Sequence, residues 1–512
     1  MAIDSMLAGV RAPDQEADDE LSGATLGRAT PGRATPDRDT PGQGAAGTGT
    51  AGVDTRELQR LDAAHYLHPF TDHGALRERG VRVMVRGDGI HVWDSDGNQI
   101  IDGMSGLWCV NVGYGRATIA DAVARQMAAL PFYNSFFNTT NVPAVRLAAR
   151  LAALAPERMR RVFFTSSGSE ANDTAVRMVW RYWQLMGQPQ RQAIISRRNA
   201  YHGSTIAGAS LGGMAGMHAQ GALPIPGIHH IEQPNYAELG SGMSEAEFGL
   251  KAARWLEEKI LALGPEHVAA FIGEPVQGAG GVIIPPATYW PEIQRICDRY
   301  GILLVSDEVI CGFGRLGAWF GCETMGSRPD LISFAKGVTS GYVPLGGVLV
   351  SDRVADLLID KGGDFCHGFT YSGHPVACAA ALENIRILVE ERLVERVAQE
   401  TGPYLKAAFG ALATHPLVGH AESLGMAAGL DLVRRKGATV HDCEPFAREL
   451  GVGMLCRGLM FDNGVIMRAV GDRMIVAPPL VMTCAEIDEM VGRIRVCLDL
   501  TLAELMQRGW MS

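Results

Sequence analysis

The sequence lacks several features that would place it in common classes of protein. No apolar run approaches the roughly 20 residues that a membrane-spanning helix needs, and no block of Lys or Arg interrupts a chain whose formal net charge is −10. Nucleic acids and anionic membranes are usually bound through such basic blocks. We therefore expect neither of them as a partner, and a small molecule is the better hypothesis for what the chain binds.

Paired cysteines are missing too. Ten cysteines are scattered from Cys109 to Cys497 without a CxxC pair, and the first residues do not resemble a secretory leader. This pattern indicates reduced thiols and predicts a cytoplasmic protein. Cys311, within an apolar stretch, is expected to be a buried space-filling residue. His229 and His230 are adjacent instead of spaced along one helical face, so we predict no metal site.

The first fifty or so residues have a composition of their own. Residues 28–42 read RATPG, RATPD and RDTPG, a repeat of Thr-Pro units. Such a segment cannot bury enough apolar surface to offset the entropy lost on ordering, so we predict that residues 1–54 are a disordered tail. The acidic stretch DQEADDE at residues 14–20 argues against a mitochondrial presequence, because presequences are poor in acidic residues.

The rest of the chain alternates short apolar runs with longer segments of helical spacing. Residues 245–263, for example, place Phe248, Ala252, Trp255 and Ile260 on roughly one helical face. The continuous apolar runs predict strands buried on both faces, and therefore an α/β fold with a mainly parallel sheet covered by helices. The runs are residues 161–166, 193–196, 268–274, 302–308 and 331–336. With 512 residues, 47% of them hydrophobic, the chain can form two domains.

In sheets of this kind ligands bind at the carboxyl ends of the strands, and polar residues follow each run. After the first run, Gly168 and Ser169 open a helix and could offer backbone N–H groups to a phosphate. Taken alone, this turn is ambiguous, because such a turn is more often an ordinary helix N-cap. The second run precedes a loop with Tyr201 and His202, which could stack on a flat ring. The third ends on Glu274 and a glycine-rich turn.

The last two runs each stop on a charge, Asp307 and Lys336. Buried charges are costly unless they are paired or used, and these two could be a structural ion pair. However, an amine, a carboxylate, a phosphate cradle and an aromatic ring are together the parts of a pyridoxal phosphate site. The lysine would condense with the cofactor aldehyde, and the carboxylate would keep the pyridine nitrogen protonated. The five strand ends together therefore predict a pyridoxal phosphate enzyme.

The wording of these motifs resembles the class III aminotransferases, pyridoxal phosphate enzymes of fold type I. The likeness runs from about His65 to Leu505 and rests on SDEVICGFGR, FAKG, SSGSEAND, YHG, GEPVQGAGG, GLWCVNVGYGR and HGFTYSGHP. Within the class, HPFTD, SLGGM, LPIPGI and MRAVGDRMIVAPPL resemble the putrescine or polyamine:pyruvate transaminases. The resemblance implies transfer of an amino group from such an amine to pyruvate by a ping-pong mechanism, giving an aldehyde and alanine.

The resemblance also implies roles for individual residues. Lys336 would bind the cofactor and carry the proton, and Asp307 would pair with the pyridine nitrogen. The cofactor would also contact Gly168, Ser169, Tyr201, Glu274 and Val309, and Thr370 would reach it from the other subunit. The substrates would contact Phe70, Trp108, Arg468 and, again from the other subunit, Phe136. The implied active unit is a homodimer or tetramer with active sites at the interface.

The same resemblance divides the chain into domains. After the tail, residues 55–105 would join the C-terminal residues 375–512 in a smaller α+β domain. Residues 106–374 would form the large cofactor-binding domain.

Arg468 bears on the substrate class, because a guanidinium between apolar residues needs a partner. In relatives, the matching arginine binds the carboxylate of the keto acid bidentately. A salt bridge to Asp472 is the structural alternative. β-Alanine, taurine and 4-aminobutyrate stay open as donors, and class III decarboxylases and aminomutases share Lys336 and Asp307. A non-catalytic interaction protein that keeps the fold is the alternative of a different class.

Overall fold

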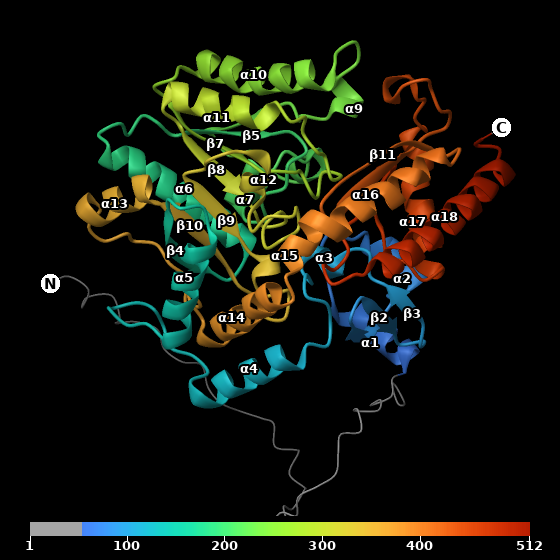
Figure 1. Ribbon diagram of the computed structural model, residues 1–512, viewed down its shortest axis with the longest axis horizontal. Helices are drawn as coiled ribbons and strands as arrows, with labels where there is room; N and C mark the ends of the chain where they lie inside the picture. Colours follow the sequence, from blue (N-terminus) through green and yellow to red (C-terminus); the bar gives the residue numbers. More distant parts are fainter. Residues whose placement is uncertain (1–53, 512) are drawn as a thin grey trace, which may run out of the picture. The chain divides into compact units, whose positions relative to one another are not determined.

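The computed structural model of the chain describes residues 54–511 (Figure 1), so the predicted disordered tail lies outside the described residues except for its last position. All the described residues belong to one compact unit, and the division into domains at residues 105 and 374 stays a prediction. No helix within residues 54–511 is both long and apolar enough to cross a membrane.

A seven-stranded sheet lies at the centre of the fold, and only one of its strands runs against the others. Its order is β4 (Met159–Thr165), β10 (Gly346–Ser351), β9 (Leu331–Phe334), β8 (Leu303–Asp307), β7 (Val268–Gly273), β5 (Ala193–Arg197) and β6 (Ile228–Ile231). The antiparallel strand is β10, which pairs with β4 and β9. The prediction of a mainly parallel sheet is therefore confirmed.

Two strands of this sheet, β6 and β10, were not predicted. The edge strand β6 has two half-buried histidines at its centre, so it carries no continuous apolar run. β10 begins with two glycines, which are weak strand formers. A side chain on Gly347 would lie 2.5 Å from the ring of Phe334 and 2.7 Å from the carbonyl oxygen of Phe163. The tight packing of β10 thus requires glycine, and glycine is also the reason why the sequence does not predict a strand here.

Helices cover both faces of the sheet. On β8, Val305 packs against α6 (Gly168–Leu185), whereas the neighbouring Leu304 packs on the opposite face with α10 (Glu245–Leu263) and α11 (Tyr289–Tyr300). Figure 1 shows α10 and α11 together along one side of the sheet. Burial on both faces explains why these strands read as continuous apolar runs.

The predicted helix at residues 245–263 is confirmed as α10. It starts after Ser244, whose side chain accepts a hydrogen bond from the backbone of the first turn. Phe248, Ala252 and Ile260 are fully buried on one face, as predicted, and Trp255 packs against the same cluster while remaining partly exposed. Cys311 is buried as expected.

Two smaller sheets are antiparallel throughout. One contains β1 (Met84–Asp88), β2 (His91–Asp94) and β3 (Gln99–Ile101); the other has the order β11 (Val418–Leu424), β12 (Ala427–Leu432), β14 (Arg473–Val476) and β13 (Arg468–Val470). The remaining α-helices are α1 (Thr55–His65), α2 (His73–Arg79), α3 (Ser105–Trp108), α4 (Ala117–Ala129), α5 (Val142–Leu154), α7 (Ile206–Leu211), α8 (Ala215–His218), α9 (Tyr236–Leu239), α12 (Gly321–Met325), α13 (Asp352–Lys361), α14 (Pro375–Glu390), α15 (Leu393–Arg396), α16 (Gly402–Gly410), α17 (Val452–Asp462) and α18 (Cys484–Gln507).

The strand directions bring the predicted site residues to one edge of the large sheet. β4, β5, β7, β8 and β9 share one direction, so their carboxyl ends lie at the same edge. Asp307 at the end of β8 is in register with Ser333 of β9, three residues before Lys336. The fold therefore places the carboxylate and the amine on adjacent strand ends.

Candidate functional site

The five strand ends surround a cavity of about 120 Å³. Seven of the predicted site residues line it: Gly168, Ser169, Tyr201, Glu274, Asp307, Val309 and Lys336. The rest of the lining is Asn172, His202, Gly203, Ile310 and Ala335. The structure thus brings together residues from all five predicted strand ends.

Asp307 is buried and held by three hydrogen bonds. Its Oδ2 accepts one from Asn172 Nδ2 and one from His202 Nδ1, both at 2.7 Å, and its Oδ1 accepts one from the backbone N–H of Val309 at 3.1 Å. Burial by itself would raise the pKa of Asp307, but these hydrogen bonds outweigh it and keep the pKa below its ordinary value. The carboxylate therefore stays ionised around neutral pH.

Asn172 and His202 hold the Asp307 carboxylate, a role that the sequence analysis assigned to neither. His202 stood in the loop we singled out, but we expected it to stack on a ring, not to bind Asp307. Asn172 follows Gly168 by four positions on α6, and residues at this spacing share one helix face. This spacing could have predicted Asn172 as a lining residue, because a helix whose first turn faces a cavity presents the same face of its second turn to that cavity.

Lys336 occupies an unusual backbone conformation for a lysine. Its φ of 46° lies in the left-handed region, which costs energy for any residue with a side chain and is concentrated at functional sites. Part of the side chain faces the cavity, and protein surrounds the rest. Burial lowers the pKa of Lys336, with Asp307 and Glu274 among the groups that oppose this effect. A lowered pKa favours the neutral amine, the form that can accept a proton.

The N-terminal end of α6 faces the same cavity through Gly168 and Ser169. Ser167 caps the helix and accepts a hydrogen bond from the N–H of Glu170 at 3.2 Å. The first N–H groups of a helix have no partner within it, which suits them to a phosphate. Ser169 Oγ accepts a hydrogen bond from the N–H of Ser204 at 3.1 Å, so its own hydrogen can be donated to an anion.

Glu274 fastens the loop of Tyr201 to the end of β7. Its two carboxylate oxygens accept hydrogen bonds from the N–H groups of Tyr201 at 3.1 Å and Gly278 at 2.8 Å. Burial raises the pKa of Glu274. The ring of Tyr201 meets that of Phe70 edge to face, with the centroids 6.3 Å apart. The contacts of Glu274 and Tyr201 with a cofactor stay predictions.

Trp108 and Arg468 lie against each other. The guanidinium carbon of Arg468 is 5.0 Å from the centroid of the Trp108 ring, and burial lowers the pKa of Arg468. Within residues 54–511, Arg468 forms no ion pair. Asp472 instead accepts a hydrogen bond from the N–H of Gly453 at 2.9 Å, so the salt bridge weighed as an alternative is not formed.

Phe136 and Thr370 do not line this cavity. Phe136 is 37% exposed and its ring lies beside Gly368, and Thr370 is exposed in the turn that follows. Both residues were expected to act on the site of another subunit. Their roles therefore stay predictions.

The lining residues fit pyridoxal phosphate. They supply an ionised carboxylate for the pyridine nitrogen, a lysine for the aldehyde and a helix terminus for the phosphate. A methyl group on Gly168 would lie 2.9 Å from both γ carbons of Val309. Any larger residue at position 168 would thus push against Val309.

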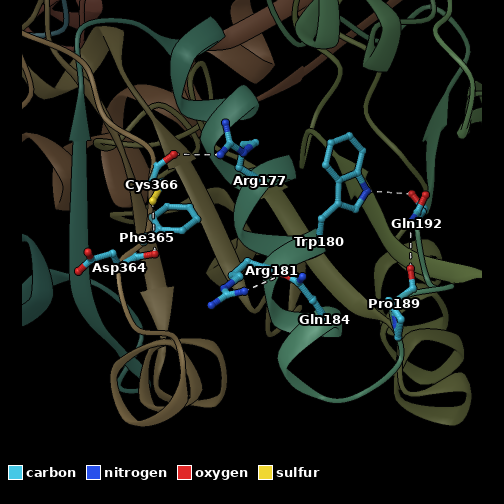
Figure 2. Close-up of a pocket in the computed structure, with 9 residues that line it drawn as sticks. All are labelled: Arg177, Trp180, Arg181, Gln184, Pro189, Gln192, Asp364, Phe365 and Cys366. Carbon is cyan, nitrogen blue, oxygen red and sulfur yellow. Dashed lines mark hydrogen bonds between the residues drawn. The ribbon is translucent and has the colours of Figure 1, made fainter. Parts of the chain in front are cut away.

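A second cavity, of about 510 Å³, lies along the C-terminal half of α6 (Figure 2). Two of its polar side chains bond the backbone: Arg177 donates a hydrogen bond to the carbonyl oxygen of Cys366 at 3.1 Å, and Trp180 Nε1 donates one to that of Gln192 at 3.0 Å. None of the predicted site residues lines this larger cavity. The smaller cavity is therefore the candidate active site.

Comparison with known proteins agrees with the geometry. The family model "Aminotransferase class-III" matches residues 75–498. A putrescine–pyruvate aminotransferase from Pseudomonas aeruginosa is 57% identical over 452 residues, which cover 88% of this chain and 98% of that protein. A mitochondrial gamma-aminobutyrate transaminase 1 from Solanum lycopersicum is 42% identical over 430 residues, covering 83% of this chain and 82% of that protein.

Solved structures are similar along nearly the same length. An (S)-enantioselective omega-transaminase from Thermomicrobium roseum superposes with a TM-score of 0.84 at 44% identity, covering 88% of this chain and 99% of that one. An omega-transaminase from Pseudomonas jessenii in complex with PMP has a TM-score of 0.84 at 42% identity, with coverage of 87% and 98%.

Replacement of Asp307 by Asn tests the central carboxylate. We expect turnover to fall by at least about 100-fold, because a neutral amide cannot hold the pyridine nitrogen protonated. The measurement is single-turnover kinetics at saturating cofactor. Asp356→Asn removes an equal charge from an exposed position of α13 and is the control. Equal turnover in the two variants would contradict the assignment.

Proposed function

Because the chain belongs to the class III aminotransferases, a family of pyridoxal-phosphate-dependent enzymes, we propose that it moves an amino group from putrescine or a related ω-amine to pyruvate. The products are an aldehyde and alanine, and the kinetics are ping-pong. The observation that carries the reaction type is the meeting of Asp307 and Lys336 at one cavity beside a helix terminus. The donor is supported by the 57% identical putrescine–pyruvate aminotransferase.

The chemistry divides between the cofactor and the chain. Pyridoxal phosphate, when bound, supplies an aldehyde that takes up the amino group and a ring that withdraws electrons from the reacting carbon. Asp307, held ionised by His202 and Asn172, maintains the positive charge of the ring nitrogen. Lys336 moves the proton between the donor carbon and the cofactor, and its lowered pKa suits it to act as a base.

Arg468 is the proposed binding residue for the keto acid. It has no ion pair in the described chain and lies over Trp108, so its guanidinium is free to bind the carboxylate of pyruvate bidentately. A simple amine has no carboxylate and would leave Arg468 unused in the first half-reaction. In the family, the matching arginine moves aside for such donors.

4-Aminobutyrate is the main alternative donor, and the 42% identical tomato transaminase supports it. β-Alanine and taurine belong to the same group of candidates. Each of these donors is an anion at the end opposite its amine, so each would need Arg468 in both half-reactions. This requirement separates them from putrescine experimentally.

We also propose that the active form of the protein is a homodimer. Several large apolar side chains are exposed on the described chain, among them Phe132, Tyr133, Phe136, Phe137 and Tyr371, and exposed apolar patches mark interfaces. Two of them meet, with the rings of Phe132 and Tyr371 5.6 Å apart. Thr370 is next to Tyr371, which supports its predicted reach into the other subunit. The ten free cysteines support a cytoplasmic location.

A panel of donors tests the proposed substrate. With pyruvate as acceptor, we expect kcat/KM for putrescine to exceed that for 4-aminobutyrate, β-alanine and taurine by at least about tenfold, because a pocket built for one end group discriminates against others by such factors. Alanine formation is measured with each donor. A higher kcat/KM with 4-aminobutyrate would replace putrescine as the donor and leave the transaminase chemistry in place.

Replacement of Arg468 by Ala should separate the two substrates. We expect the KM for pyruvate to rise about 10- to 100-fold, the loss of a bidentate charged hydrogen bond, and the KM for putrescine to change little. Arg457→Ala, at an exposed position of α17, removes the same charge nearby and serves as the control. An equal rise in both KM values would remove Arg468 from the keto acid site.

A further inference from the structure

Glu308 is a buried acidic residue between two residues of the active site. Asp307 and Val309 line the cavity, and Glu308, fully buried, does not. Glu308 is the first residue after β8, and its carboxylate bonds the hydroxyl of Ser306 and the backbone of Gly321 and Cys322, none of which lines the cavity.

The carboxylate of Glu308 closes the loop that follows β8. Its Oε2 accepts a hydrogen bond from the N–H of Gly321 at 2.7 Å, and its Oε1 accepts one from the N–H of Cys322 at 2.6 Å and one from the hydroxyl of Ser306 at 3.1 Å. No basic side chain of the described residues forms an ion pair with it. These three donors are all neutral groups.

The loop at residues 309–320 is packed closely around this contact. The N–H of Gly312 donates to the carbonyl oxygen of Glu308 at 2.9 Å, and the N–H of Phe313 donates to that of Trp319 at 2.7 Å. A side chain on Gly321 would lie 3.0 Å from Oε2 of Glu308 and 2.9 Å from the β carbon of Cys311. Glycine at position 321 is therefore required for the backbone to reach the carboxylate.

The carboxylate of Glu308 is not explained by its contribution to the stability of the fold. Burial raises the pKa of Glu308 to about 7, although the N–H groups of Cys322 and Gly321 oppose this effect. Because the pKa of Glu308 is higher in the folded protein than in the unfolded chain, ionisation of Glu308 favours the unfolded state. The contribution of Glu308 to stability therefore declines as the pH rises from about 4.5 through 7.

We propose that Glu308 is a positioning residue that fixes the orientation of the Asp307 carboxylate and the Val309 side chain by anchoring the peptide between them to the start of α12. The proposal deepens the proposed function, since it depends on Asp307 meeting the cofactor ring. If the anchor is lost, the 307–309 backbone can rotate. Val309 would then shift against Gly168, and the hydrogen bond from the Val309 N–H to Asp307 would weaken.

Cofactor affinity is the direct test. In Glu308→Gln one acceptor oxygen becomes an NH₂ group facing a backbone N–H, and we expect the Kd for pyridoxal phosphate to rise by at least about tenfold, as for other residues that orient a ligating group. Kd is measured by quenching of tryptophan fluorescence in cofactor-free protein, with no amine present. The same variant should exchange the amide hydrogens of residues 309–320 faster than the wild type.

Two further variants serve as a control and as a second test. Glu323→Gln removes another carboxylate from the start of α12, one that accepts from the N–H of Phe320 at 2.9 Å on the exposed side, and should change Kd by less than about twofold. Ser306→Ala removes the donor at the longest distance, 3.1 Å, is a smaller change than Glu308→Gln, and should raise Kd by a few-fold.

The outcomes separate the positioning role from the proposed function. If Glu308→Gln and Glu323→Gln raise Kd equally, or if Glu308→Gln and Ser306→Ala leave Kd at the wild-type value, the positioning role is wrong. If Glu308→Gln does not fold, the Ser306→Ala value decides. If the wild type itself does not bind pyridoxal phosphate, the proposed function fails instead.

Discussion

The hydrogen-bonded carboxylate of Asp307 is the interaction on which the rest of the site depends. Burial would neutralise it, yet Asn172, His202 and the N–H of Val309 keep its pKa low. Each of these donors comes from a different part of the chain. Only the sheet, with its strand ends at one edge, brings α6, the loop after β5 and the turn after β8 to the same carboxylate.

Lys336, at the same edge of the large sheet, has the opposite tendency: its environment favours the neutral form. Asp307 stays charged in spite of its burial because hydrogen-bond donors surround it, whereas the burial of Lys336 outweighs the effect of the nearby acidic groups and favours the neutral amine. A carboxylate that stays ionised and an amine that loses its proton readily are the pair that transamination needs. The left-handed backbone at Lys336 is a further cost that the surrounding packing must offset.

Much of this arrangement could be predicted from the sequence. The apolar runs marked five of the seven strands of the sheet, and the residues at their ends supplied six of the seven predicted lining residues, because strand ends of one direction must meet. The seventh, Val309, came from the family resemblance. The runs could not reveal β6, whose centre is polar, or β10, whose glycines are dictated by Phe334 and Phe163. The pairing of Asn172 and His202 with Asp307 was hidden for another reason. A hydrogen bond between residues 135 positions apart leaves no local pattern. The roles of Phe136 and Thr370 stay predictions, because they were expected at the site of another subunit.

The visible absorption spectrum of the purified protein tests the central claim most directly. The spectrum is taken with pyridoxal phosphate bound, again after addition of putrescine without a keto acid, and again after pyruvate. If Asp307 and Lys336 hold the cofactor for amino transfer, putrescine should bleach the cofactor's visible band and pyruvate should restore it. A protein that stays colourless after addition of pyridoxal phosphate, or whose band responds to no amine, would contradict the claim.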